Sequence, residues 1–221
     1  MSYLALYRKF RPQTFDEIVG QDFVVTTLKN QIKSGNISHA YLFTGTRGTG
    51  KTTAAKVFSR AINCLNPVDG NPCMKCRSCL DNGGMDIVEL DAASNNGVEY
   101  IRDIKEKVQY APGSSKYKVY IIDEVHMLSQ SAFNAFLKTL EEPPAHAVFI
   151  LCTTEAYKIP QTILSRCMRF DFKLVGVDKL EALVGDVLVR SGKSFTPEAL
   201  NAVAGAGEGS ARDALSVADR C

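Results

Sequence analysis

The chain has 221 residues, of which 45% are hydrophobic and 23% charged, the profile of a globular protein with a substantial core. Its net charge of +2 gives no overall attraction for nucleic acid, so any such contact needs a local basic patch. No stretch approaches the ~18 apolar residues that span a bilayer, and the N-terminus lacks the features of a signal peptide. These observations predict a cytoplasmic protein whose cysteines are thiols or metal ligands rather than disulfides.

Short apolar segments that alternate with amphipathic helices predict a parallel α/β sheet. The expected strands lie at residues 40–44, 86–90, 118–122, 148–152 and 168–172. The expected helices between them lie at residues 51–62, 98–108 and 129–144, the last with Ser129 as its N-cap. After residue 172 only helical patterns follow, at residues 178–192, 196–207 and 210–221. We therefore expect an α/β domain over residues 1–175 and a helical domain from residue 176 that is cut off at Cys221.

A phosphate-binding pattern stands between the first expected strand and the first expected helix. The segment GTRGTGKT, Gly45 to Thr52, matches G-x-x-x-x-G-K-[ST] completely. Its glycines let backbone amides wrap phosphates at a helix N-terminus. Lys51 would reach the β- and γ-phosphates of ATP, and the Thr52 hydroxyl would bind Mg²⁺. The expected nucleotide contacts in this region are Gly45, Thr46, Arg47, Gly48, Thr49, Gly50, Lys51, Thr52 and Thr53.

Adjacent carboxylates end the third expected strand. Asp123 is predicted to share Mg²⁺ with Thr52, and Glu124 to polarise the attacking water. His126 is interpreted as a hydrogen-bonded structural histidine. Arg166 and Arg212 are candidates for the extra positive charge that hydrolysis needs, and their spacing alone leaves two surface arginines as the alternative.

Cysteines are spaced C-x₈-C-x₂-C-x₂-C at Cys64, Cys73, Cys76 and Cys79. Four thiolates suit tetrahedral Zn²⁺, and a closed four-sulfur shell leaves no position for catalysis. We expect a structural zinc module over about residues 64–82, inserted after the helix that follows the phosphate-binding loop. A base-reading finger is disfavoured, because the segment after Cys79 is a short turn that leads straight into the second strand.

Motifs spread over almost the whole chain resemble those of AAA+ P-loop NTPases of the clamp-loader class, and most closely the N-terminal part of the bacterial DNA polymerase III gamma/tau family. Besides the cysteine cluster, they are YRKFRPQTFDEIVGQ (7–21), HAYLFTGTRGTGKTT (39–53), LDAASNNGVEYIRDI (90–104), VYIIDEVHMLSQSAFNAFLKTLEEPP (119–144), TILSRC (162–167) and EGSARDAL (208–215). The resemblance implies a five-stranded parallel sheet flanked by helices, followed by a partial helical lid domain.

The resemblance also assigns roles to residues that spacing leaves open. Arg166 is similar to a finger that acts in trans on the ATP of a neighbouring subunit. Thr154 matches the sensor-1 position, and Arg212 matches sensor 2 of the lid. The residues that match the strip packed against adenine and ribose are Arg11, Pro12, Ile18 and Val19.

The family works within a heteropentamer of the DNA polymerase III holoenzyme, a transferase in which these subunits are ATPases and not the polymerising subunit. ATP binding opens a sliding clamp, and primer-template DNA then triggers hydrolysis and release. Members continue into a collar domain that this chain lacks, so the fragment is expected to be mostly monomeric and to hydrolyse ATP slowly. The implied cofactors are ATP or ADP, Mg²⁺ and structural Zn²⁺.

Several interpretations stay open. Asn95, Asn96 and Arg102 could contact DNA phosphates, or Ser94 and Asn95 could simply cap a helix. Another AAA+ DNA machine, such as a branch-migration helicase, is disfavoured because that family has neither the cysteine cluster nor the SRC motif. A nonhydrolytic zinc- and DNA-binding scaffold is disfavoured because the phosphate-binding loop and the acidic pair are both intact.

Overall fold

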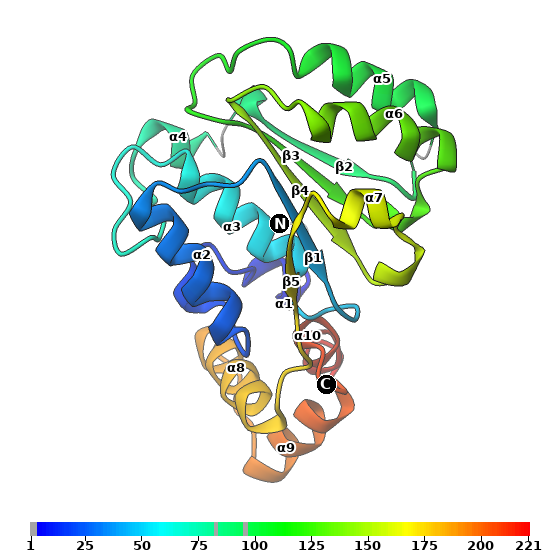
Figure 1. Cartoon of the computed structure of the whole chain (residues 1–221). Helices are drawn as coiled ribbons and strands as arrows, with labels where there is room; N and C mark the ends of the chain where they lie inside the picture. Colours follow the sequence, from blue (N-terminus) through cyan, green and yellow to red (C-terminus); the bar gives the residue numbers. More distant parts are fainter. Residues whose placement is uncertain (1–3, 82–83, 95–96) are drawn as a thin grey trace.

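The computed structural model describes residues 4–81, 84–94 and 97–221, and it is built around a five-stranded sheet (Figure 1). The strands are β1 (Ala40–Thr44), β2 (Ile87–Asp91), β3 (Lys118–Asp123), β4 (Ala147–Thr153) and β5 (Met168–Asp171). Every neighbouring pair is parallel, in the order β2-β3-β4-β1-β5. The expected five-stranded parallel sheet is therefore confirmed, and β4 lies between the strand that precedes the glycines and the strand that ends in the carboxylates.

Alternate side chains of the central strands enter two separate cores, because a strand points successive residues to opposite faces. Tyr41, Phe43 and Ile121 pack on the face covered by α2 (Asp22–Ser34) and α3 (Lys51–Ile62). Leu42 and Phe149 pack on the other face, under α5 (Val98–Lys107) and α6 (Gln130–Glu141). Figure 1 shows these helix pairs on opposite sides of the sheet.

The helices after β5 form a separate layer with its own apolar cluster. They are α8 (Val177–Arg190), α9 (Pro197–Ala206) and α10 (Ala211–Ala218). Thr196 and Ser210 cap α9 and α10 through their hydroxyls, which accept from the amides of Ala199 and Asp213 at 3.2 and 3.1 Å. We call α8, α9 and α10 the lid.

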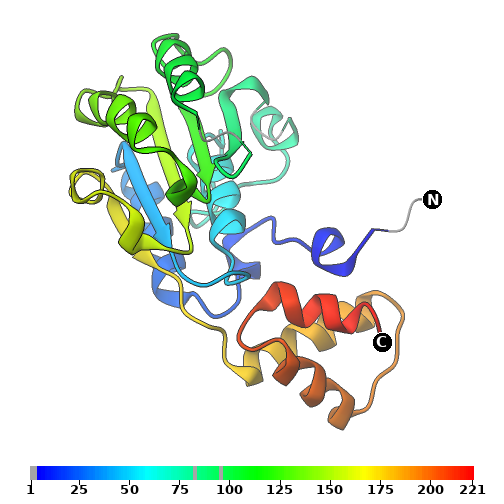
Figure 2. The same cartoon turned by 90° about the vertical axis from the view of Figure 1, so that its right-hand side faces the viewer.

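The first helix of the chain packs with the last ones. α1 (Leu6–Lys9) buries Leu6 in the lid cluster, and the Leu6 amide donates to Asp219 Oδ2 at 3.3 Å. In Figure 2 this N-terminal helix lies against α10, away from the sheet. The segment from α1 to the 3₁₀ turn η1 (Phe15–Glu17) therefore runs between the lid and the sheet domain.

Local details differ from the expected boundaries. β2 begins one residue later than expected, because Asp86 instead accepts hydrogen bonds from the amides of Gly113, Ser114 and Ser115. α5 begins after Gly97 without a side-chain cap, and the Ser94 hydroxyl bonds Asp91 instead. Capping by Ser94, one of the two open alternatives, is therefore not observed, while Asn95 and Asn96 lie outside the described residues.

The remaining elements are short. They are α4 (Arg77–Leu80), α7 (Gln161–Leu164), η2 (Gly84–Asp86), η3 (Val125–Met127) and η4 (Ala156–Lys158). In the part of the chain that the structure describes, no helix has the length and apolarity needed to cross a bilayer.

Candidate functional site

The segment Gly45–Thr52 links β1 to α3 and includes the first two residues of α3; we call it the glycine loop, and it surrounds the side chain of Lys51. Gly45, Gly48 and Gly50 have φ values of +147°, +76° and +101°, a region that favours glycine. Lys51 Nζ donates 2.8 Å hydrogen bonds to the carbonyls of Gly45 and Thr46. Burial lowers the pKa of Lys51, partly offset by the nearby Cys152, Glu124 and Asp123. The loop thus holds a desolvated ammonium group beside a row of backbone amides, an arrangement suited to phosphate.

The acidic pair meets the glycine loop at the carboxyl edge of the sheet. The Thr52 hydroxyl donates to Asp123 Oδ2 at 2.8 Å, although the residues lie far apart in the sequence. Glu124 follows with a left-handed backbone, φ +47°, which is uncommon for a residue with a side chain. Its Oε2 accepts a 3.2 Å hydrogen bond from the Thr154 hydroxyl at the end of β4. The strand order explains the contact, because β4 is the neighbour of β3.

A cavity of about 710 Å³ opens beside this edge, between the sheet domain and the lid. Arg11 lies in its wall, where the Arg11 Nε donates to the Thr53 hydroxyl at 3.2 Å and burial lowers the pKa of Arg11. The expected residues that line the cavity are Arg11, Pro12, Ile18, Val19, Arg47, Gly48, Thr49, Gly50, Lys51, Thr52, Thr53, Asp123, Glu124 and Arg212. The structure therefore brings the N-terminal strip, the glycine loop, the acidic pair and the lid arginine to one place.

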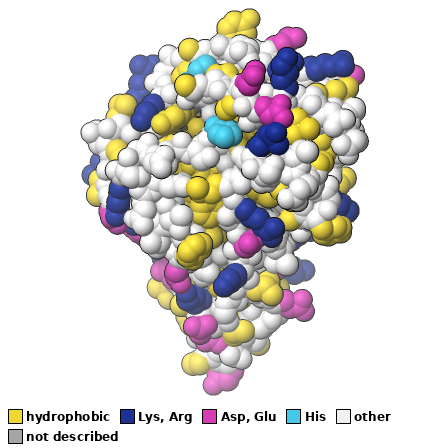
Figure 3. Space-filling model, in the orientation of Figure 1, with side chains coloured by type: hydrophobic (Ala, Val, Ile, Leu, Met, Phe, Trp, Pro, Cys, Tyr) yellow, Lys and Arg dark blue, Asp and Glu magenta, His cyan; other side chains and the backbone are white. Residues whose placement is uncertain are grey.

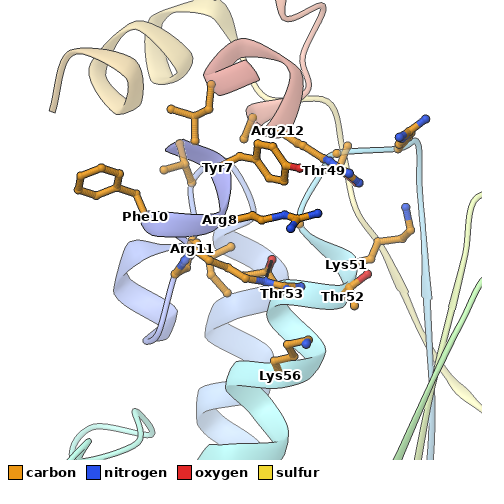
Figure 4. A pocket seen from close by; sticks show the side chains of 18 of the residues that line it. Tyr7, Arg8, Phe10, Arg11, Thr49, Lys51, Thr52, Thr53, Lys56 and Arg212 are labelled. Carbon is orange, nitrogen blue, oxygen red and sulfur yellow. Dashed lines mark hydrogen bonds between the residues drawn. The ribbon is translucent and has the colours of Figure 1, made fainter. Parts of the chain in front are cut away.

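Among the lining side chains, Arg8, Lys56 and Glu89 have no site role predicted from the sequence. Figure 4 shows Tyr7 and Arg8 of α1 beside Arg212 of the lid, near the start of α3. The Arg212 guanidinium lies 5.0 Å from the centre of the Tyr7 ring, and hydrogen bonds with Arg8 and Arg212 lower the pKa of Tyr7. Lys56 and Glu89 form an ion pair at the rim. Lys56 lies one helical turn beyond Thr52 on the same face of α3. This spacing is the local feature of the sequence that predicts Lys56 near the cavity.

Four further expected residues of the nucleotide site, Gly45, Thr46, Thr154 and Arg166, lie outside the cavity lining. Thr154 reaches the site through Glu124, as described above, and Gly45 and Thr46 reach it through Lys51. Arg166 lies elsewhere: it follows α7, pairs with Glu141 Oε1 at 2.7 Å and donates to the Thr162 carbonyl. Within this chain Arg166 does not meet the cavity.

The cysteine cluster forms a compact group between α3 and β2. The sulfurs of Cys64, Cys73, Cys76 and Cys79 all lie within 4.8 Å of one another. A tetrahedron with Zn–S bonds of about 2.3 Å has sulfurs about 3.8 Å apart, and Cys64 and Cys76 lie 3.9 Å apart. Although burial opposes it, hydrogen bonds from the backbone of Leu65 and Cys79 lower the pKa of Cys76 to about 6. The donor set fits a structural zinc ion.

The cluster is tied to the rest of the sheet domain by polar contacts near Asn71. The Asn71 side chain accepts from the Phe15 amide at 2.9 Å and donates to Asp16 at 2.8 Å. Asp69 pairs with Lys29 of α2 at 2.7 Å. The inserted segment is therefore anchored to α2 and η1 as well as through the cysteines themselves.

Fold and site together define a protein of the AAA+ fold class. The Thermotoga maritima RuvB Holliday junction branch migration motor superposes with a TM-score of 0.72 at 18% identity, covering 96% of this chain and 64% of that one. At that identity the likeness shows the fold. A gamma subunit-related protein of DNA polymerase III from Thermotoga maritima superposes with a TM-score of 0.54 at 25% identity, over 74% of this chain and 51% of that one.

Sequence comparison gives the family. The model for the DNA polymerase III delta subunit matches residues 20–175, and that for the ATPase lid domain of the DNA polymerase III clamp loader subunit matches residues 180–221. The tau subunits of DNA polymerase III from Bacillus subtilis and Escherichia coli are 54% and 48% identical over all of this chain. The gamma subunit from Buchnera aphidicola subsp. Baizongia pistaciae is 41% identical. The chain belongs to the tau/gamma family of DNA polymerase III clamp-loader subunits.

The chain spans only part of these relatives: 40% and 35% of the two tau subunits and 60% of the gamma subunit. What the whole proteins do is therefore carried over to this chain only as a proposal.

Proposed function

We propose that this chain is an ATP-binding and ATP-hydrolysing motor of a replicative clamp loader, which uses ATP binding to open a sliding clamp and hydrolysis to release it on primed DNA. The observation that carries the proposal is the meeting of Thr52, Asp123, Glu124 and Thr154 at one edge of the sheet. Membership of the tau/gamma family supports the loader in particular.

In this proposal the cavity holds ATP with its phosphates on the amides of the glycine loop. Lys51 exchanges the carbonyls of Gly45 and Thr46 for the β- and γ-phosphates, an exchange favoured because the ammonium is already desolvated. Thr52 and Asp123 would hold Mg²⁺, which neutralises developing phosphate charge. Arg11, Pro12, Ile18 and Val19 form the wall for adenine and ribose.

Hydrolysis in this proposal needs a water aligned with the γ-phosphate. The Glu124 carboxylate orients that water and receives its proton, while the Thr154 hydroxyl fixes one carboxylate oxygen. Arg212 adds charge from the lid. Arg166 serves the ATP of a neighbouring subunit, in keeping with its distance from the cavity of its own chain. The isolated chain should therefore hydrolyse ATP slowly.

The proposal also includes contacts with DNA and with protein partners. The side chain of Arg102 on α5 is exposed, as a phosphate contact requires. The face in Figure 3 shows Lys and Arg interspersed with Asp and Glu rather than a single basic patch. We propose that DNA is contacted through its sugar-phosphate backbone by the assembled ring. The sliding clamp and other loader subunits are the proposed protein partners.

The domain organisation belongs to the same proposal: an ATPase domain over residues 1–175, a zinc module at about 64–82, and a lid from residue 176 that leads to a collar. The zinc site is proposed to be structural, because its four ligands leave no open position. A nonhydrolytic scaffold is less well supported, because the residues proposed for Mg²⁺ and water, Thr52 with Asp123 and Glu124 with Thr154, are present and in contact.

The test is the binding of a fluorescent ATP analogue with Mg²⁺, followed by capture of a bacterial sliding clamp. We expect binding by the wild-type chain and none by Lys51→Ala. In the full-length protein assembled with its partner subunits, clamp capture should require ATP. Equal nucleotide binding by both variants would contradict the site, and clamp capture that ignores ATP would contradict the motor role.

A further inference from the structure

His126 occupies a buried position directly beside the acidic pair. It lies in η3, two residues after Glu124, and its side chain is only 7% exposed. Both ring nitrogens have polar neighbours: Nδ1 lies 3.0 Å from Thr153 Oγ1, and Nε2 lies 3.0 Å from Glu155 Oε2. The imidazole therefore bridges the end of β4 and the segment that follows it.

These partners decide which ring nitrogen carries the proton. Tyr157 and Lys158 donate to Glu155 at 2.6 and 2.8 Å, which favours its ionised form, and a carboxylate only accepts hydrogen bonds. His126 Nε2 must then carry the hydrogen. The Thr153 hydroxyl oxygen accepts from the Glu155 amide at 2.9 Å, which leaves its own hydrogen able to point to Nδ1. The arrangement satisfies every polar group of a neutral imidazole in one tautomer.

The same ring edge touches the Glu124 carboxylate. His126 Nδ1 lies 3.4 Å from Glu124 Oε2, the oxygen that also accepts from Thr154. In this tautomer Nδ1 carries no hydrogen, so the contact is a close approach of two acceptor atoms rather than a hydrogen bond. It limits rotation of the carboxylate, while among the described residues no hydrogen bond engages the other oxygen, Oε1. The Glu124 side chain is 35% exposed and lines the cavity, so Oε1 is available to water.

We propose that His126 is a positioning residue for ATP hydrolysis: as a neutral ring held by Thr153 and Glu155, it keeps the Glu124 carboxylate turned toward the cavity. This inference rests on the proposed ATPase function. It goes beyond a structural role for the histidine, because it predicts that losing the ring slows hydrolysis while nucleotide binding, which involves the glycine loop and the lid, stays the same.

The first experiment measures single-turnover hydrolysis of ATP by the 221-residue chain and, separately, its affinity for a fluorescent ATP analogue. We expect His126→Ala to slow hydrolysis about 10- to 100-fold, the scale of a misplaced catalytic group, with affinity changed less than twofold. His126→Asn, which keeps an acceptor facing Thr153 and fills space beside Glu124, should recover part of the rate.

His146→Ala is the matched control, because His146 is half-buried and is also hydrogen-bonded, but to the Val108 carbonyl, away from the cavity. It should leave rate and affinity within twofold of the wild type. Hydrolysis by His126→Ala at the wild-type rate would overturn the proposal. So would an equal loss of affinity and rate, since that is the result expected of general unfolding.

The second experiment measures the protonation of the His126 ring directly and does not depend on ATP hydrolysis. Imidazole ¹⁵N NMR of the wild-type chain should show His126 as the neutral tautomer with its hydrogen on Nε2. Thr153→Val, which keeps the shape of the side chain and removes the hydroxyl, should shift the Nδ1 resonance. A hydrogen on Nδ1 would overturn the proposal. If Lys51→Ala bound nucleotide as well as the wild type, the ATPase function would fail instead, and the NMR result would still test the arrangement.

Discussion

Ser210 of the lid lies directly against Gly48 of the glycine loop: a methyl group at Gly48 would stand 1.8 Å from the Ser210 hydroxyl oxygen. The residue that caps α10 therefore touches the loop proposed to bind phosphate, with Arg212 two positions further on. Glycine is required at position 48 for two reasons, its φ of +76° and the space taken by the lid.

Gly48→Ala should therefore displace the lid as well as strain the backbone. We expect about tenfold weaker ATP binding and a loss of about 1 kcal/mol or more in the free energy of unfolding, measured by denaturant titration. Gly35→Ala is the matched control, because Gly35 has a similar φ of +70° but open space around it. It should show the backbone strain without the loss of affinity. Equal affinities for the two variants would mean that displacing the lid from Gly48 does not affect nucleotide binding.

Glu124→Gln should separate binding from hydrolysis. The amide keeps the shape of the side chain but cannot take a proton from water, so single-turnover hydrolysis should fall at least about 100-fold. Affinity for the ATP analogue should stay within about threefold. Glu142→Gln, a change of an exposed carboxylate at the end of α6, should alter neither quantity. Rapid hydrolysis by Glu124→Gln would show that another group orients the water.

Arg166 should matter only in an assembly. In the isolated chain, Arg166→Ala should leave ATP affinity and the slow rate of hydrolysis unchanged, because Arg166 pairs with Glu141 away from the cavity. In the full-length protein assembled with its partners, the loss should reach about 10³-fold or more, as for other arginine fingers. Arg169→Ala serves as the control, since Arg169 is a nearby exposed arginine paired with Asp171. A large loss in the isolated monomer would contradict action in trans.

The cysteine cluster should stabilise the fold without affecting nucleotide chemistry. Metal analysis should find one zinc ion per chain, and Cys76→Ser should lower both the zinc content and the melting temperature. ATP affinity measured below the new melting temperature should change less than twofold. Cys221→Ser, at an exposed position outside the cluster, should change none of these. Loss of ATP binding from a folded, zinc-free chain would contradict the structural role.

Asp86 should make stability depend on pH. Burial alone would raise the pKa of Asp86, but hydrogen bonds from the amides of Ser114, Gly113 and Ser115 outweigh it and lower the pKa. Its contribution is therefore present above the pKa of the unfolded chain and lost as pH falls through the lower folded value. Asp86→Asn should cost about 1–3 kcal/mol at pH 7 and progressively less in acid, as urea titrations would measure. An equal cost at every pH would mean that the charge plays no part.

Much of the site followed from the sequence because its chemistry is local. The glycine loop, the Asp123–Glu124 pair and the cysteine spacing each lie within a short segment, and the alternation of apolar segments indicated the parallel sheet. α2 was not anticipated, because Val24, Val25, Thr26 and Thr27 favour a strand over a helix. Its helical form accompanies the burial of Val24 and Leu28 against the sheet domain.

The sequence by itself determined which chemical groups are present and which segments carry them, since spacing along one strand or loop sets their local geometry. Only the tertiary structure decided which of these segments meet. Placing β4 beside β3 brings Thr154 to Glu124 and His126 between Thr153 and Glu155. Packing α1 on the lid brings Tyr7 and Arg8 to Arg212. These contacts join residues far apart in the chain. Their energies come from burial and strand pairing across the whole fold, so no short stretch of sequence predicts them.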